Sequence, residues 1–406
     1  MKKNVIYVMF SVIGIQGATY LAQLILATML STNEFAIVRT VEASLQLISA
    51  IAPIGISMLV VRMAAQDDVE IEKNRTLTSY LILVFVNGLG MAIICSVGIF
   101  LMREESISNK YLQSAIWVVM LSNVSRTILN YLYGRERFSL VSICSFVIAL
   151  VYLFALYILV GNIGLNGWII SKYIVEVSFF ILSIYFIRNR LTSFITKLNF
   201  YVHALREGSA IASSLLFRTS LDTVPLLIGS YFILDGSIVG VFGFCTLLIT
   251  AATILPGSIT TVLLSKYSKA KANDSTALFK MHIKYKKIVL IASIFSAIGV
   301  VLAGVFLNYL MQDKFKNAGV MLSLMSLVIP MKVMGTLDAN ILFVYGRAIV
   351  GTKILGVVAL IEIVLLLLLV PLFGIGAVIS IVLVMETLSS FALHKYAKIQ
   401  FESINR

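Results

Sequence analysis

Long apolar runs recur along the whole chain and leave little sequence for a water-soluble core. A transmembrane helix needs about 20 consecutive, mostly apolar residues, and twelve windows of this kind follow one another in the 406 residues. The sequence therefore predicts an all-α polytopic membrane protein with about 12 transmembrane helices. The predicted spans lie near residues 5–30, 36–61, 77–102, 111–133, 138–160, 163–187, 207–234, 238–264, 288–311, 318–345, 348–370 and 374–394.

The composition also requires lipid as the solvent for most of the chain. Hydrophobic residues make up 60% of the sequence and charged residues 13%, whereas soluble domains carry about 25% charged residues. The net charge of +13 would suit a nucleic-acid partner. However, the basic residues fall in short loops between apolar runs and form no continuous basic face. We therefore expect no nucleic acid among the partners.

The distribution of lysine and arginine predicts the orientation of the chain. The basic loop residues collect on one side of the predicted arrangement, and the opposite side has only Arg103, Lys110, Lys314 and Lys316. Because cytoplasmic loops are enriched in basic residues, both termini are predicted to be cytoplasmic. The first apolar run, Val5 to Leu30, is too long for the core of a signal peptide and is interpreted as the first span.

Two halves of six spans are predicted, with a longer cytoplasmic connection between them. The expected organisation is an N-terminal lobe at 1–187, a linker at 188–206 and a C-terminal lobe at 207–406. No GxxxxGK[ST] nucleotide-binding motif occurs, so active transport would use an ion gradient, the membrane potential or a partner protein. The three cysteines and three histidines show no metal-ligand spacing, and we expect no metal or cofactor.

Short matching patterns indicate that the two halves are repeats that run in the same direction. Tyr133-Gly134-Arg135 follows the fourth span and Tyr345-Gly346-Arg347 the tenth. Gly164 to Gly167 begins the sixth span and Gly374 to Ala377 the twelfth. The second pair of patterns places Glu176 opposite Glu386, and the first places Arg126 opposite Asp338. A parallel repeat predicts a pseudo-twofold axis along the membrane normal.

The chain resembles the multidrug/oligosaccharidyl-lipid/polysaccharide exporter superfamily, and within it the O-antigen flippases, which are Wzx-type polysaccharide biosynthesis proteins. The resemblance covers the whole chain. It rests on the twelve spans, on the repeated turns and glycine-rich starts described above, and on Leu30-Ser31-Thr32-Asn33-Glu34-Phe35-Ala36. This last segment resembles a loose family turn in which glycine usually stands at the position of Ala36.

The resemblance implies a MATE-like fold of two six-helix lobes around a cavity that opens alternately to each side. It also implies a flippase of O-antigen and lipopolysaccharide biosynthesis in the bacterial inner membrane. Such a flippase moves an undecaprenyl-diphosphate-linked oligosaccharide from the cytoplasmic to the periplasmic leaflet. The implied partners are this glycan, membrane lipid, a polysaccharide polymerase and a chain-length regulator. An ion-coupled multidrug exporter, acting as an antiporter, and a lipid II flippase of the same superfamily remain open.

Ionisable residues inside the predicted spans are candidates for function, because each costs about 2.5–3.5 kcal/mol on insertion scales. Three pairs have helical spacing and are expected to neutralise each other locally: Arg39 with Glu42, Lys172 with Glu176, and Arg218 with Asp222. The candidates for the substrate path are Arg126, Arg218, Lys332, Arg39 and Lys172. The candidates for proton coupling or ion pairing are Asp222, Asp338, Glu176, Glu386 and Glu42.

Two of these cations have no acidic neighbour three or four positions away. Arg126 and Lys332 must therefore meet a partner on another helix, or water and substrate. Arginine suits an anionic diphosphate because its planar fork can bind two phosphate oxygens. The pair Arg218 and Asp222 lies just before Pro225, which frees a backbone carbonyl and permits a kink. A membrane enzyme is not expected, because the outer loops are short and no histidine in a span is paired.

Overall fold

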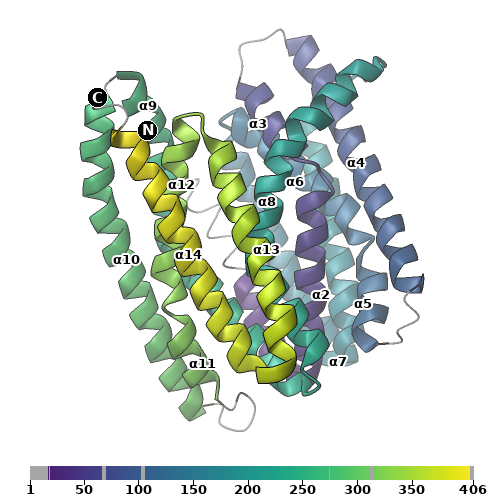
Figure 1. Ribbon diagram of the computed structural model, residues 1–406. Helices are drawn as coiled ribbons and strands as arrows, with labels where there is room; N and C mark the ends of the chain where they lie inside the picture. Colours follow the sequence, from purple (N-terminus) through teal and green to yellow (C-terminus); the bar gives the residue numbers. More distant parts are fainter. Residues whose placement is uncertain are drawn as a thin grey trace. The chain divides into compact units, whose positions relative to one another are not determined.

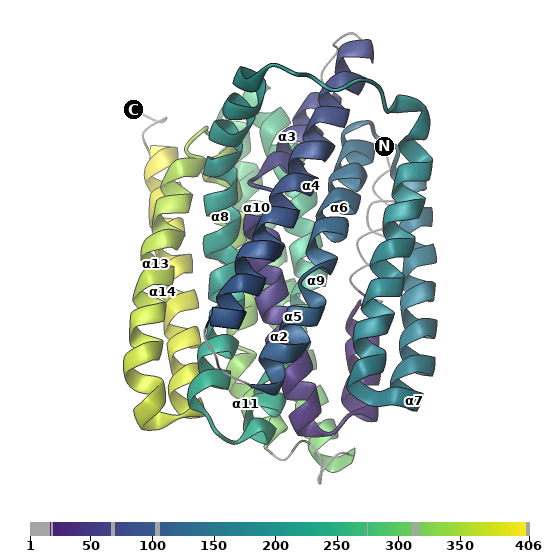
Figure 2. The same ribbon diagram turned by 90° about the vertical axis from the view of Figure 1, so that its right-hand side faces the viewer.

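A computed structural model of the chain is almost entirely helical in the part that it describes (Figures 1 and 2). The described residues are 17, 19–65, 70–101, 106–273, 275–310, 315 and 317–402, and they contain no β-strand. Eight helices among them are long and apolar enough to cross a bilayer, and a bent helix pair makes a ninth span. The prediction of an all-α polytopic membrane protein is confirmed.

The helices are often broken within a predicted span, so that their number differs from the number of spans. The first unit of the chain contains a helix at Thr19–Met29, followed by α2 (Thr32–Ile51), α3 (Ile56–Ala65), α4 (Glu70–Leu101), α5 (Ile107–Ala115), α6 (Val118–Gly134), α7 (Phe138–Ile187), the 3₁₀ turn η1 (Arg188–Arg190) and the beginning of α8 (Leu198–Phe232), which continues into the second unit. The second contains α9 (Gly236–Asn273), α10 (Ser275–Leu310), α11 (Ala318–Met325), α12 (Val328–Val344), α13 (Ala348–Phe373) and α14 (Ile375–Glu402).

Breaks at identifiable residues explain how these helices map onto the predicted spans. α7 is interrupted at Ile163 and Gly164, where the backbone is not helical, and it folds back there (Figure 2). A Cβ on Gly167 would lie 2.2 Å from the carbonyl oxygen of Leu159, so glycine permits the close approach after the break. α7 therefore covers two predicted spans. α2 with α3, α5 with α6, and α11 with α12 each cover one. Over the described residues the arrangement is consistent with the predicted twelve spans. Residues 5–16 of the first span lie outside them.

The chain divides into two compact units, Met1–Thr219 and Ser220–Arg406. The boundary lies inside α8, and α8 itself begins at Leu198, within the segment predicted as the linker 188–206. The irregular part of this segment is held on α4, where the backbone N–H of Ile195 donates to Ser79 Oγ at 2.8 Å. Phe200 on α8 stacks on Tyr80 of α4 with ring centroids 5.2 Å apart. The connection is thus part of the first unit, and the predicted lobe boundaries stay a prediction.

Each unit has its own apolar core. In the first unit, α6 packs against α3, α4 and α7 around residues such as Leu77, Ile128 and Val141. In the second, α12 packs against α9, α10 and α14 around Leu263, Leu337 and Ile341 (Figure 1). The outward faces are apolar as well. In α4, for example, Phe100 is 75% exposed. Because no soluble protein leaves such a surface in water, these faces are expected to contact lipid.

From α6 and α12 onward, equivalent positions in the two repeats are 210 residues apart. α6 spans Val118–Gly134 and α12 spans Val328–Val344, so both ends are offset by 210. Gly164 (φ 57°, ψ −133°) and Gly374 (φ 59°, ψ −140°) have the same unusual backbone conformation at the same offset. This register pairs Glu176 with Glu386, as the sequence patterns indicated.

The same register corrects the alignment of the two Tyr-Gly-Arg turns. The left-handed residue is Glu136 (φ 55°) after α6 and Gly346 (φ 73°) after α12, again 210 positions apart. Aligning the identical Tyr-Gly-Arg residues gave an offset of 212. This alignment was wrong because the position of Gly346 in the second turn is occupied by Glu136 in the first. Arg126 therefore corresponds to Thr336 and not to Asp338.

Close packing at the break between α2 and α3 generates a first prediction. A Cβ atom on Gly208 of α8 would lie 2.0 Å from the carbonyl oxygen of Ile54, in the break. Gly208→Ala should therefore force the backbone apart and destabilise the protein by about 1–3 kcal/mol, as overpacking does. Thermal unfolding of the purified protein in detergent measures this as a lower melting temperature.

Gly299→Ala is the matched control, because the added Cβ on α10 meets no atom within 4 Å. Alanine is the better helix former by about 1 kcal/mol, so this variant should be unchanged or more stable. Equal melting temperatures for the two variants would contradict the close approach of α8 to the break.

Candidate functional site

Most of the ionisable residues predicted inside the spans lie in three groups, two in the first unit and one in the second. One group surrounds Glu42 in the first unit, and Arg126 with Glu176 forms a second group there. The third group lines a small cavity in the second unit. Asp338 belongs to none of these and lies in a separate buried cluster.

Glu42 of α2 is a carboxylate shared by two cations and an amide. Its side chain is 8% exposed. Arg39 Nη1 lies 3.3 Å from Oε2 and Lys172 Nζ lies 2.9 Å from Oε1. Gln23 Nε2 donates to Oε2 at 2.5 Å. The predicted pair of Arg39 with Glu42 is present, but Lys172 forms its ion pair across helices with Glu42 and not with Glu176 one turn away.

The position of Lys172 is fixed by a second interaction. Its Nζ lies 5.7 Å from the ring centroid of Trp168, which is one turn earlier on α7 and fully buried. A cation over an indole face is attracted by the ring electrons. Together the carboxylate and the ring hold Lys172 toward α2, which sequence spacing alone does not indicate.

Arg126 is an exposed cation on a helix whose adjoining residues are buried. Ser125 and Thr127 on either side are fully buried, whereas Arg126 is exposed. Over the described residues it forms no hydrogen bond or ion pair, although Glu176 of α7 is close enough to interact with it electrostatically. Glu176 Oε2 is buried and likewise has no hydrogen-bond partner among those residues. This region of the first unit therefore has polar groups available for a ligand or water.

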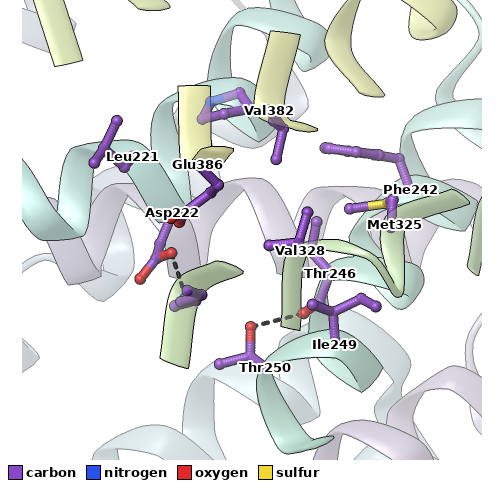
Figure 3. Close-up of a pocket in the computed structure, with 12 residues that line it drawn as sticks. Leu221, Asp222, Phe242, Thr246, Ile249, Thr250, Met325, Val328, Val382 and Glu386 are labelled. Carbon is purple, nitrogen blue, oxygen red and sulfur yellow. Dashed lines mark hydrogen bonds and ion pairs between the residues drawn. The ribbon is translucent and has the colours of Figure 1, made fainter. Parts of the chain in front are cut away.

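A cavity of about 40 Å³ lies in the second unit between α8, α9, α12 and α14 (Figure 3). Asp222, Lys332 and Glu386 line it, together with the threonines at 246 and 250. Figure 3 shows the two carboxylates on the same side of the cavity. One water needs about 10–15 Å³ by this measure, so the cavity has room for a few waters or small ions and is too small for a sugar.

Within the cavity Lys332 Nζ forms an ion pair with Asp222 Oδ1. This confirms that Lys332 has its partner on another helix. Pro225 also lines the cavity and leaves the carbonyl of Leu221, one turn earlier, without its usual helical donor. Arg218 lies one turn before Asp222 on α8, and the predicted pairing of these two residues stays a prediction.

Asp338 lies in α12 among groups that the sequence did not mark. Its side chain is 2% exposed and lies within 4 Å of His282, Lys286 and His394. These residues come from α10 and α14, far apart in the sequence, so their spacing gives no signal. No group of three or more His, Cys, Asp or Glu suited to a metal ion occurs in the described part of the chain.

Comparison with known proteins gives a fold and no sequence relative. No family model matches the chain, and no curated protein matches it. A multidrug resistance MATE family transporter of the MOP superfamily, in an inward-facing conformation, has a TM-score of 0.76 at 10% identity, covering 99% of this chain and 95% of its own. The chain has the fold of a MATE-type transporter.

Other solved structures support the same fold over the full length. An outward-facing MATE family transporter gives a TM-score of 0.72 at 14% identity and covers 100% of this chain and 96% of its own. A MOP superfamily transporter from Pyrococcus furiosus, described as having a binding pocket of reverse polarity, gives 0.66 at 13% identity, with coverage of 100% and 97%. The chain therefore has the multi-pass helical fold of these structures over its full length.

The shared carboxylate of Glu42 generates a second prediction. Glu42→Gln removes the carboxylate that Arg39 and Lys172 both contact, at side-chain exposures of 12% and 22%. Removing one partner from a buried ion pair costs about 3–5 kcal/mol, so the melting temperature in detergent should fall clearly. Adding Lys172→Met to Glu42→Gln removes one uncompensated charge and should recover part of the loss.

Lys172→Met alone is the control, because Glu42 keeps Arg39 and Gln23 as partners. Its melting temperature should fall less than that of Glu42→Gln. If the double variant were no more stable than Glu42→Gln, the charge of Lys172 would not be compensated by Glu42, which would contradict the account.

Proposed function

We propose that the chain is a flippase for an undecaprenyl-diphosphate-linked oligosaccharide. It would move the repeat unit of O-antigen or a related surface polysaccharide from the cytoplasmic to the periplasmic leaflet of a bacterial inner membrane. The MATE-type fold supports transport by alternating access. The resemblance of the sequence to O-antigen flippases supports the cargo, and a polysaccharide polymerase and a chain-length regulator are the expected protein partners.

The observation that carries this proposal is the exposed guanidinium of Arg126. The residue lies eight positions before the end of α6, about 12 Å along the helix axis, and is therefore inside the predicted bilayer. Ionisable residues at this depth face a bundle interior or a water-filled path because lipid does not solvate them. Since Arg126 has no ion pair among the described residues, an anion that arrives from outside the fold would compensate it.

The other candidate cations support Arg126 by contrast. Arg39 and Lys172 are compensated by Glu42, and Lys332 is compensated by Asp222. An anionic diphosphate would have to displace a carboxylate to reach any of these three. Arg126 requires no such displacement, and its planar fork suits two phosphate oxygens.

The cavity in the second unit supports coupling to a proton gradient. Two carboxylates, Asp222 and Glu386, line it, and Lys332 forms an ion pair with Asp222. A proton on Asp222 would neutralise the carboxylate and release Lys332. Because Asp222 is on α8 and Lys332 on α12, binding of the proton would change how these two helices contact each other. Substrate contact in the first unit and proton contact in the second are separate roles in this proposal.

Arg126 provides the direct test, in a strain that lacks the gene and carries a plasmid copy. A hydrogen bond to a charged group contributes about 1.5–3 kcal/mol, so Arg126→Ala should lower surface polysaccharide by about tenfold or more. Lipid-linked repeat units should accumulate in the membrane. Arg126→Lys keeps the charge without the fork and should restore part of the transport.

Arg137→Ala is the matched control, because Arg137 is an exposed arginine in the turn after α6, outside the apolar span. It should support normal surface polysaccharide at equal protein level. Wild-type polysaccharide in the Arg126→Ala strain would contradict the role of Arg126. Unchanged polysaccharide in the deletion strain itself would contradict the cargo.

An ion-coupled small-molecule exporter is the second candidate, and the same cavity favours it. Two carboxylates and one lysine line this cavity, and an acidic site suits cationic compounds. The MATE neighbours described as multidrug resistance transporters support this alternative equally. A deletion strain with normal polysaccharide and increased sensitivity to cationic dyes or drugs would favour the exporter.

A further inference from the structure

Five polar side chains from four helices meet in one buried cluster near the basic end of the second unit. Asp338 of α12 and Tyr267 of α9 are almost fully buried, and His282 of α10 is 4% exposed. Lys286 of α10 and His394 of α14 are the more exposed members. Asp338 lies six residues before the end of α12, at the end predicted to face the cytoplasm. None of these residues lines the cavity described above.

The contacts of Asp338 are unequal between its two oxygens. Oδ1 lies 3.1 Å from His282 Nε2 but makes no hydrogen bond among the described residues. Oδ2 lies 3.1 Å from His394 Nδ1 and 3.8 Å from Lys286 Nζ. A buried carboxylate needs donors to replace water. The stability of the ionised Asp338 carboxylate therefore depends strongly on which group donates a hydrogen bond to Oδ2.

His282 is held from its other side. Its Nδ1 lies 3.2 Å from the hydroxyl of Tyr267. The neutral ring can accept a hydrogen bond from Tyr267 at Nδ1 while Nε2 carries the proton that faces Asp338. His282 thus has a consistent arrangement in its neutral form.

His394 has two contacts that one ring nitrogen cannot satisfy at the same time. Its Nδ1 lies 2.9 Å from Lys286 Nζ and 3.1 Å from Asp338 Oδ2. The ammonium of Lys286 is a donor only, so Nδ1 must be unprotonated to accept from it. The carboxylate is an acceptor only, so Nδ1 must carry a proton to donate to Asp338. Unprotonated Nδ1 therefore accepts from Lys286, protonated Nδ1 donates to Asp338, and the atom cannot serve both neighbours at once.

We propose that this cluster is a proton-binding site in which His394 and Lys286 exchange places as the counter-ion of Asp338. With His394 neutral and its proton on Nε2, the Lys286 ammonium donates to Nδ1 and is the full positive charge beside Asp338. A proton taken from the cytoplasm onto Nδ1 makes His394 the donor to Oδ2 and repels Lys286, which moves out to water. The side chain of His394 is 46% exposed, which gives the proton access, and that of Lys286 is 28% exposed, which gives the ammonium an exit.

The exchange is placed where it can act on the transport cavity of the same unit. Asp338 follows Lys332 by six residues on α12, and His394 follows Glu386 by eight residues on α14, about 9 and 12 Å along the helix axes. α12 and α14 pack extensively against each other. Loading the cluster with a proton therefore changes the contact between the two helices that carry Lys332 and Glu386.

The neighbouring lysines on the two helices that carry His394 and Lys286 are exposed to water, which screens their charge. On α14 they are Lys395 and Lys398, both exposed, and on α10 they are Lys284 and Lys287, both exposed. Tyr285 of α10 and Tyr267 of α9 interact electrostatically with each other. The charged residues of α13 are Lys353, which is exposed, and Glu362. Lys286 and Asp338 are thus the charged groups within 4 Å of His394 in the described residues.

The test measures the protonation of each histidine in the full-length protein, purified in detergent. Hydrogen–deuterium exchange at imidazole C2, followed by mass spectrometry across a pH series, gives a separate titration midpoint for each of the three histidines. Lys286→Met removes the competing cation and should move the midpoint of His394 to higher pH, by about one unit, which is a tenfold change in proton affinity. Asp338→Asn removes the acceptor and should move it to lower pH.

Two internal controls make the result specific. His203, whose side chain is 72% exposed on α8, should keep its midpoint in every variant. Lys287→Met, beside Lys286 but exposed, should leave the midpoint of His394 unchanged. An unmoved His394 midpoint in Lys286→Met, or an equal movement in Lys287→Met, would overturn the proposal. If Asp338→Asn does not fold, the two lysine variants alone decide. The measurement needs no cargo, so its outcome is independent of the proposed flippase activity.

Discussion

The structure depends on compensating charge inside a chain that is otherwise apolar. A carboxylate or cation that lipid would leave unsolvated must find its counter-ion within the fold. Glu42 does so with Arg39 and Lys172, and Asp222 with Lys332. The pairs of Glu42 with Lys172 and of Asp222 with Lys332 connect different helices and so help to determine which helix faces meet. Arg126 departs from this pattern, which is why it carries the functional proposal.

The positions of the spans could be predicted because each is encoded locally. An apolar run of bilayer length predicts a transmembrane helix without reference to the rest of the chain, and glycines at the breaks indicate where a span ends. Gly164 and Gly374 were recognised as matching starts, and their shared left-handed conformation explains why glycine stands at both. The Tyr-Gly-Arg turns were misaligned for a physical reason. Glu136 tolerates the conformation that Gly346 adopts, so identical letters did not mark equivalent positions.

The polar clusters could be predicted only in part. Helical spacing identified Arg39 with Glu42, because these residues lie on one face of α2. The same rule failed for Lys172, whose nearest carboxylate is on another helix and whose position is fixed by the ring of Trp168. His282 and His394 are 112 positions apart in the sequence, and only the packing of α10 and α14 around α12 brings them to Asp338. Contacts of this kind arise from tertiary packing and leave no pattern in one sequence.

The transport proposal separates a cargo contact on the first unit from proton-dependent contacts on the second. Its central claim, that the cargo is an anionic lipid-linked oligosaccharide, can be measured with purified protein in liposomes. Undecaprenyl-diphosphate-linked repeat units are placed in both leaflets, and a membrane-impermeant glycosidase digests those in the outer leaflet. We predict that the protein, under a pH gradient, exposes the inner pool to digestion much faster than in protein-free liposomes. An inner pool that stays protected equally long with and without the protein would contradict the claim.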